Sequence, residues 1–242
     1  MIGERSYRIR MPEATQPGKP VGAVIFNHGY KGTADGLMRN KRLARVVSDM
    51  GLAFVAPKSA GDDWDIPNAP FPNSNSDVGF FKDLKKQLVS EHNIDADRIM
   101  VTGFSAGGMM VWNLACQVGD QFAAYVPISG TFWAPVPQSC ATLPVNLVHI
   151  HGTSDKVVPM KGRKILKTHQ GDVYKSLDLM ARSADFGKWR SMGEANGLTC
   201  QQRDSASHML RLCLHPGGHS FKSEWLRDAW NAFKDAGTFK SG

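Results

Sequence analysis

Residues 98–108 have the sequence RIMVTGFSAGG, in which an apolar run is followed at once by small residues. Residues 98–102 predict a buried strand and residues 106–117 a helix, so Ser105 falls on the turn between them. The pattern G-x-S-x-G, here Gly103 to Gly107, is typical of a serine on a sharp, strained turn, where glycines let the strand and the helix approach closely. Ser105 would then lie at the helix N-terminus, where the dipole and free N–H groups favour a developing negative charge. The turn predicts Ser105 as a nucleophile and the backbone N–H of Ala106 as the first oxyanion donor.

Short apolar runs alternate with amphipathic stretches on both sides of this turn. Strands are expected at residues 6–11, 21–27, 52–56, 98–102, 123–129, 145–151 and 207–215, and helices at 37–50, 78–91, 106–117 and 223–236. Residues 58–76 are expected to be irregular, and residues 162–192 a mostly helical insertion that could act as a lid. This alternation predicts an α/β fold with a mostly parallel central sheet and helices on both faces. The 242 residues suit one catalytic domain over residues 1–242, and the apolar runs are too short to span a membrane.

The net charge of +7 raises the question of a nucleic-acid partner. The basic residues are spread along the chain and no nucleic-acid motif accompanies them, so a solvated basic surface is the better interpretation. Attraction to an acidic polysaccharide or a cell surface stays open. His149 and His151 alternate on one strand, but no third ligand lies at a telling spacing, so we expect packing there, with no metal and no cofactor.

Four cysteines, Cys116, Cys140, Cys200 and Cys213, allow three pairings, and sequence alone does not choose among them. Four buried free thiols in a cytosolic protein are the alternative. No signal peptide is visible at the start of the sequence, which leaves either a cytosolic protein or one whose export segment has been removed.

A serine nucleophile needs a base to take its proton and an acid to hold that base in the right tautomer. Asp155 lies just past the strand at 145–151, at the edge of the sheet where such a site forms. His219 follows Pro216-Gly217-Gly218 on a flexible turn after the last expected strand. The chain order Ser105, Asp155, His219 is typical of α/β-hydrolases, whereas Asp62, Asp63 and Asp65 precede the nucleophile and fit that order poorly.

The second oxyanion donor is expected from the loop after the strand at 21–27. That loop begins Asn27-His28-Gly29-Tyr30, and we predict the N–H of Tyr30 as the donor. His28 is better interpreted as a residue that shapes the loop. Aromatic candidates for a substrate pocket are Trp64, Phe71, Phe104 and Trp133, although packing explains each of them equally well.

These residues together suggest a family. The whole chain resembles the polyhydroxybutyrate depolymerase and feruloyl or acetylxylan esterase group of secreted α/β-hydrolases. The resemblance lies in residues 3–7, Asn27-His28-Gly29, Asp77-Val78-Gly79-Phe80, residues 97–109, His151-Gly152-Thr153-Ser154-Asp155 with Val158-Pro159, and Gly217-Gly218-His219-Ser220. It implies a Ser105–Asp155–His219 triad, oxyanion donors at Tyr30 and Ala106, disulfides Cys116–Cys140 and Cys200–Cys213, and export to the periplasm or the medium.

Two departures from the group concern the substrate. Residues 162–192 lengthen the passage between the acid and base loops, and Ser220-Phe221 stands where a tryptophan is common. The expected activity is hydrolysis of a carboxylic ester, small or polymeric, through an acyl-enzyme, as in feruloyl esterases or polyhydroxybutyrate depolymerases. Alternatives are an acetylxylan esterase, a peptidase or a thioesterase on the same fold, or an inactive relative that binds a polymer.

Overall fold

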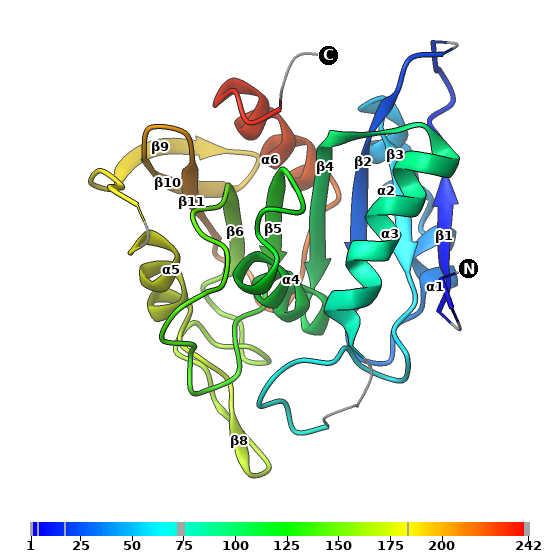
Figure 1. Cartoon of the computed structure of the whole chain (residues 1–242). Helices are drawn as coiled ribbons and strands as arrows, with labels where there is room; N and C mark the ends of the chain where they lie inside the picture. The colour runs from blue at the N-terminus through cyan, green and yellow to red at the C-terminus, as the bar shows by residue number, and fades with distance from the viewer. Residues whose placement is uncertain (1, 4, 17, 72–75, 183, 240–242) are drawn as a thin grey trace.

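The computed structural model describes residues 2–3, 5–16, 18–71, 76–182 and 184–239 (Figure 1). Glu4 in the opening motif, residues 72–75 of the irregular stretch and residue 183 of the expected insertion lie outside the described residues.

One nine-stranded sheet organises the described residues, in the order β1-β3-β2-β4-β5-β6-β11-β10-β9 (Figure 1). Its strands are β1 (Tyr7–Arg10), β2 (Val21–Asn27), β3 (Ala53–Pro57), β4 (Ile94–Phe104), β5 (Ala124–Ile128), β6 (Leu147–Gly152), β9 (Arg190–Ala195), β10 (Leu198–Asp204) and β11 (Met209–His215). The strands from β3 through β11 in this order pair in parallel, whereas β1 at one edge and β10 and β9 at the other pair antiparallel. The prediction of a mostly parallel α/β sheet is confirmed.

Helices cover both faces of the sheet (Figure 1). They are α1 (Ala34–Arg39), α2 (Lys41–Asp49), α3 (Asp77–His92), α4 (Ala106–Gln117), α5 (Val173–Ala181) and α6 (Glu224–Asp235). Side chains alternate along β2, so that Ala23 and Ile25 join the core with α3 and α4, while Val24 and Phe26 join the core with α2 and α6. Because a strand covered on both sides has no polar face, β2 is apolar from Val21 to Phe26, and only Asn27 at its end is polar.

The helix predicted over residues 37–50 is wrong, because two helices occupy this region. Asn40 ends α1 and begins α2, with an extended ψ of 92° and a side-chain oxygen that accepts the N–H of Leu43 at 3.1 Å. An asparagine that can bond to its own backbone competes with helix continuation, so the break falls there.

The prediction of a mostly helical segment over residues 162–192 is also wrong. It begins with a short hairpin of β7 (Lys164–Ile165) and β8 (Thr168–His169), its one helix among the described residues is α5, and it ends in β9. Strands β9 and β10, which the sequence analysis missed, are joined by Asn196-Gly197 with φ of 55° and 76°. An Asn-Gly pair in which both residues adopt positive φ is the strongest short hairpin signal in a sequence.

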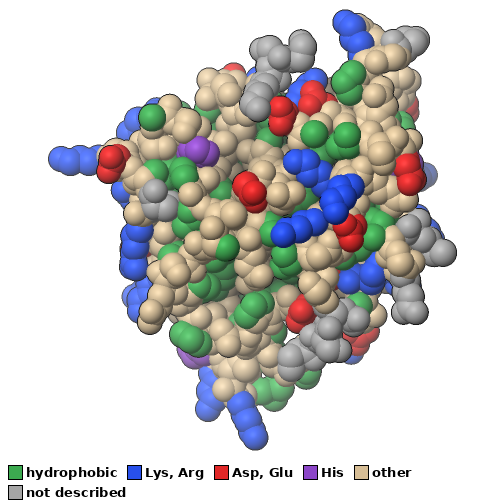
Figure 2. Space-filling view, in the orientation of Figure 1, with side chains coloured by type: hydrophobic (Ala, Val, Ile, Leu, Met, Phe, Trp, Pro, Cys, Tyr) green, Lys and Arg blue, Asp and Glu red, His purple; other side chains and the backbone are tan. Residues whose placement is uncertain are grey.

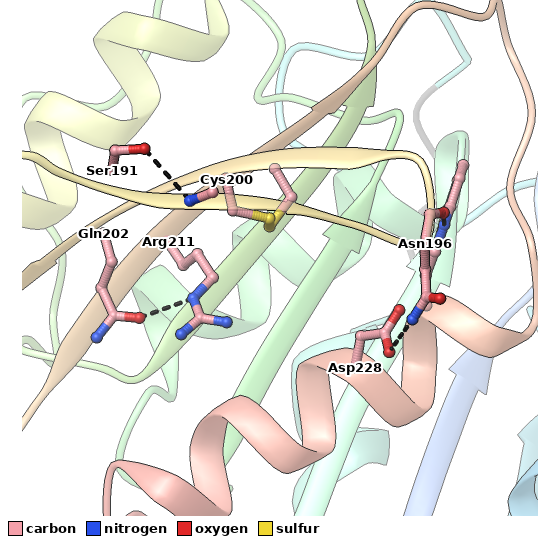
Figure 3. The surroundings of a disulfide bond; sticks show 9 residues. Ser191, Asn196, Cys200, Gln202, Arg211 and Asp228 are labelled. Atoms are coloured by element: carbon pink, nitrogen blue, oxygen red, sulfur yellow. Dashed lines mark hydrogen bonds between the residues drawn. A yellow bond between two sulfur atoms is a disulfide. The ribbon is translucent and has the colours of Figure 1, made fainter.

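Both disulfides that the resemblance implied are present. Cys116–Cys140 ties the end of α4 to the loop after β5, and Cys200–Cys213 joins paired positions of β10 and β11. Figure 3 shows the second bond beside the hairpin turn, where the side-chain amide of Asn196 donates to Asp228 of α6 at 2.8 Å. Cross-links of this kind are typical of proteins outside the reducing cytosol. No helix in the described ranges is long and apolar enough to cross a membrane.

Candidate active site

Ser105 occupies the turn between β4 and α4 and has a strained backbone, with φ 58° and ψ −121°. An L-residue adopts such a conformation only when the surrounding structure enforces it, and such strain clusters at functional sites. The side chain is half-buried and does not cap the helix. Ser105 therefore lies at the N-terminus of α4 without a capping hydrogen bond from its hydroxyl.

The two glycines of the turn are required by close backbone contacts. A Cβ on Gly103 would lie 2.5 Å from the carbonyl of Gly107, and a Cβ on Gly107 would lie 2.1 Å from the carbonyl oxygen of Asn27. Both distances are far below van der Waals contact, so only glycine lets β2, β4 and α4 meet here. This contact brings the end of β2 next to Ser105.

The loop after β2 packs directly against Ser105. A Cβ on Gly29 would lie 3.5 Å from the Cβ of Ser105, and the loop is fixed by a 2.7 Å hydrogen bond from the N–H of Lys31 to the carbonyl of Asp62. Within the described ranges, the backbone N–H groups of Tyr30 and Ala106 have no acceptor. Two free donors thus come from the two segments that meet at Ser105, as an oxyanion hole requires.

His28 is a structural residue of this loop. Its Nε2 accepts the N–H of Ser59 at 3.3 Å, so its Nδ1 carries the proton and donates to the carbonyl of Gly29 at 2.9 Å. Its own carbonyl accepts the indole N–H of Trp64 at 2.8 Å. Burial lowers the pKa of His28, which keeps the ring neutral and suited to these bonds.

Asp155 and His219 form a hydrogen-bonded pair. Nδ1 of His219 donates to Oδ2 of Asp155 at 2.7 Å, while Oδ1 accepts the N–H groups of Val157 at 2.8 Å and Val158 at 2.9 Å. Burial alone would raise the pKa of Asp155, but the hydrogen bonds from His219 and the two amides outweigh it and the pKa is lowered. The carboxylate is therefore held ionised in a fixed orientation, with its second oxygen on the imidazole.

The ring of His219 lies next to the residue that precedes Ser105. Its centroid is 4.6 Å from that of Phe104, and the ring of Phe104 also packs on Phe221 at 5.2 Å. The described contacts include no hydrogen bond between the hydroxyl of Ser105 and His219, and catalytic hydrogen bonds often tighten only when substrate binds. The structure thus brings the three predicted residues to one edge of the sheet.

His149 and His151 lie beneath this pair and are fully buried. Nε2 of His151 donates to the carbonyl of Val158 at 2.7 Å, and its Nδ1 then accepts from Nε2 of His149 at 2.9 Å. Nε2 of His151 is also 3.6 Å from Oδ2 of Asp155. The two histidines therefore support the loop that carries the acid, which agrees with the expectation of packing.

The four aromatic pocket candidates lie in different surroundings. Trp64 is fully buried under the loop of His28, so it cannot touch a substrate, and its selection as a pocket residue is wrong. Trp133 is buried beside Phe132 and lines a small cavity of about 170 Å³ next to the Cys116–Cys140 bond. Phe104 supports His219, and only Phe71, half-exposed and stacked on the Tyr30 ring at 6.0 Å, presents a large aromatic surface to solvent.

Asp155 also has amide donors in Val157 and Val158, and Phe104 has a contact in Phe221, none of which was predicted from the sequence. The first could have been anticipated, since an Asp in a turn commonly accepts the N–H groups two and three residues ahead. The second had no local signal, because Phe221 reaches Phe104 only through the folded sheet.

Comparison with known proteins finds relatives among esterases. Residues 73–183 match the family model described as Phospholipase/Carboxylesterase. Over 90% of this chain and 70% of the relative, the sequence is 24% identical to the protein named "Putative esterase NocK" of Nocardia uniformis subsp. tsuyamanensis. It is 25% identical to the bifunctional acetylxylan esterase/xylanase XynS20E of Neocallimastix patriciarum, over 94% of this chain and 32% of that protein. It is 26% identical to feruloyl esterase C of Emericella nidulans, over 66% of this chain and 58% of that protein.

Solved structures support the fold. An acetyl xylan esterase from Aspergillus awamori superposes with a TM-score of 0.69 at 15% identity, over 94% of both chains. A carboxylesterase from Bacillus cereus superposes with a TM-score of 0.64 at 14% identity, over 96% of this chain and 95% of the other. This chain therefore shares the α/β fold of these two solved structures.

Proposed function

We propose that this carboxylesterase-family serine hydrolase, which has feruloyl and acetylxylan esterases as distant homologues, cleaves carboxylic esters through an acyl-enzyme on Ser105. The observation that carries the proposal is the 2.7 Å bond between His219 and Asp155 at the same edge of the sheet as the strained Ser105 turn. A carboxylate, an imidazole and a serine at the N-terminus of a helix are the parts that acyl transfer needs.

In the proposed mechanism, Asp155 keeps the proton of His219 on Nδ1, so Nε2 is free to accept the proton of Ser105. The Ser105 oxygen attacks the ester carbonyl, and the resulting oxyanion accepts hydrogen bonds from the N–H groups of Tyr30 and Ala106. Each such donor contributes about 3 kcal/mol to the stability of the transition state. His219 then gives its proton to the departing alcohol, and a water molecule, activated by His219 in the same way, releases the acid and restores Ser105.

The substrate proposed is an ester of the feruloyl or polyhydroxybutyrate type. The stacked rings of Tyr30 and Phe71, each about half-exposed beside the proposed oxyanion loop, supply a flat apolar surface for such a group. The homologues named above add acetylated xylan as a further candidate. The two disulfides support an exported protein, and a thiol count under non-reducing denaturation that finds four free thiols would contradict that.

The proposal is tested first by labelling with a fluorophosphonate probe. Wild-type protein should be labelled and Ser105→Ala should not, because the probe reacts with an activated serine. Absence of label on the wild type would refute the proposed function and favour an inactive, polymer-binding relative. A panel of p-nitrophenyl esters, methyl ferulate, acetylated xylan, polyhydroxybutyrate films, a thioester and a peptide, run beside Ser105→Ala, then separates the esterase from the thioesterase and the peptidase.

A further inference from the structure

A run of basic residues without any acid follows Asp155. Between Asp155 and the next acidic residue, Asp172, the chain carries five cations and neither Asp nor Glu: Lys156, Lys161, Arg163, Lys164 and Lys167. All five are exposed. None of them belongs to a salt bridge with a described residue. Like charges gathered without partners repel one another, so this segment is better suited to a ligand than to stabilising the fold.

The hairpin that carries most of these cations, residues 161–170, is here called the basic hairpin. Its two sides are tied to one peptide group, since Nε of Arg163 and the side-chain amide of Gln170 donate to the carbonyl of Val157 at 2.7 and 3.2 Å. The N–H of Val157 in turn bonds to Asp155 at 2.8 Å. At Gly162, with φ of 72°, a Cβ would lie 2.0 Å from the carbonyl of Gln170, so the hairpin closes tightly at its base. The basic hairpin thus stands at a fixed position beside the acid of the proposed active site.

An open depression of about 640 Å³ lies along the basic hairpin. Lys164, Lys167 and His169 form one side, and Asn68 and Ala69 from the irregular stretch lie on another. Figure 1 shows the β8 hairpin at the lower end of the molecule, and Figure 2 shows Lys and Arg side chains projecting there. The depression is therefore wide and lined by two lysines, and the β8 hairpin beside it lies at the end of the sheet where β4 ends (Figure 1).

The irregular stretch on the far side of the depression leads to exposed aromatic rings. Phe71 lies two residues after Ala69 and stacks on Tyr30, with an angle of 14° between the ring planes. Parallel aromatic faces open to solvent suit the flat C–H faces of sugar rings. Isolated cations on one side and aromatic faces on the other match a chain of sugars that carries carboxylates at intervals.

We propose that the basic hairpin binds a polysaccharide bearing carboxylate groups, with Lys164 and Lys167 as the main contacts, and so presents esters carried on that polymer to Ser105. The second half of this statement rests on the proposed esterase function, and the binding does not. Ile165 and Leu166 separate Lys164 from Lys167 on the basic hairpin, and the basic residues are not accompanied by a nucleic-acid motif. Leu166, 66% exposed at the tip, would suit a lipid surface, which the test includes.

The test measures binding of sodium polygalacturonate to the purified wild-type chain by isothermal calorimetry in 20 mM salt. We expect Lys164→Glu with Lys167→Glu to weaken binding at least tenfold, and added salt to weaken the wild type progressively. A matched double variant, Lys19→Glu with Lys234→Glu, makes the same charge change before β2 and near the end of α6. It should alter binding by less than twofold. The carboxyl-reduced polymer should bind at least tenfold more weakly than the acid form.

Three results would overturn the proposal. Equal losses of binding in both double variants would indicate an effect of net charge alone. The other two are absence of polygalacturonate binding in the wild type and tighter binding of the wild type to phosphatidylglycerol vesicles than to the polysaccharide. Thermal unfolding of each variant shows whether it is folded. Failure of the proposed esterase function is separately visible as absent fluorophosphonate labelling, because polygalacturonate binding requires no chemistry.

Discussion

The replacement Asp155→Asn tests the proposed acid without changing the shape of the side chain. Oδ1 of Asp155 accepts two backbone N–H groups, and Oδ2 accepts the proton of His219. The amide oxygen of an asparagine would keep the two N–H partners, since the reverse orientation loses two hydrogen bonds of about 1 kcal/mol each. A difference of about 2 kcal/mol corresponds to roughly thirtyfold, so almost every molecule would point its NH₂ group at His219.

An NH₂ group facing Nδ1 forces His219 to accept a hydrogen bond there and to carry its own proton on Nε2. The imidazole then cannot take the proton of Ser105. The wrong tautomer lowers kcat by about 10⁴ in a serine protease triad, or between 5 and 6 kcal/mol as a barrier, and we expect a loss of about that size here. The fold should persist, because the side chain keeps its volume and its two amide partners.

The assay is kcat/KM for p-nitrophenyl acetate, with thermal unfolding measured on the same samples. Asp172→Asn is the matched control, because Asp172 also accepts two backbone N–H groups, at 2.8 and 3.1 Å, but has no histidine partner in the described structure. It should keep at least half of the activity. If Asp155→Asn folds and retains more than a tenth of the wild-type value, Asp155 is not the orienting acid.

Three further changes follow from the geometry. Burial raises the pKa of Asp63 to about 6, so the folded state holds this proton more tightly than the unfolded chain does, and the free energy of unfolding falls as pH rises from about 4 to about 6. Asp63→Asn should therefore add about 1–3 kcal/mol to the free energy of unfolding at pH 8 and little at pH 3. Equal gains at both pH values would contradict this. Gly107→Ala should cost about 3 kcal/mol or more in urea unfolding, whereas Gly61→Ala, whose Cβ meets nothing within 4 Å, should leave stability unchanged or raise it by less than about 1 kcal/mol. His151→Phe removes the 2.7 Å hydrogen bond to the Val158 carbonyl, and kcat should fall about tenfold with KM unchanged. A change in KM alone would contradict a role of His151 in positioning Asp155.

The parts of the fold that could be predicted from sequence are those whose pattern is local. Strand β2 is confirmed at the predicted residues, 21–27, because an unbroken apolar run bounded by loop residues has no other stable location than a buried strand. Helix α4 is confirmed at residues 106–117, since the small residues at its start fit only a tight strand–helix turn. The pairing of His219 with Asp155 was predicted from chain order and loop position, and the hydrogen bond agrees with it.

The errors arose where a local pattern is weak or was outweighed. Every residue of β9 is exposed, so it has no apolar alternation to identify it, and only Asn196-Gly197 indicated a hairpin. Residues 162–192 contain helix-forming Lys, Leu and Met, but α5 alone obtains a buried apolar side among the described residues. Helical stability in proteins comes mainly from such burial, so the rest of the segment adopted short strands and loops. Trp64 was misjudged because nothing in its neighbourhood in the sequence indicates that its indole lies under His28.

One residue, Val157, links the two proposals made for this chain. The N–H of Val157 donates to Asp155, while the carbonyl of Val157 holds both sides of the basic hairpin through Arg163 and Gln170. The same turn therefore sets the orientation of the proposed acid and the position of the proposed polymer site. Because the N–H of Val157 belongs to the preceding peptide group, a hairpin displaced from the Val157 carbonyl would still leave that one of the two N–H bonds to Oδ1. The two functions are thus coupled through Val157 but not interdependent, which is why charge reversal at the tip of the basic hairpin can test binding without first removing the acid.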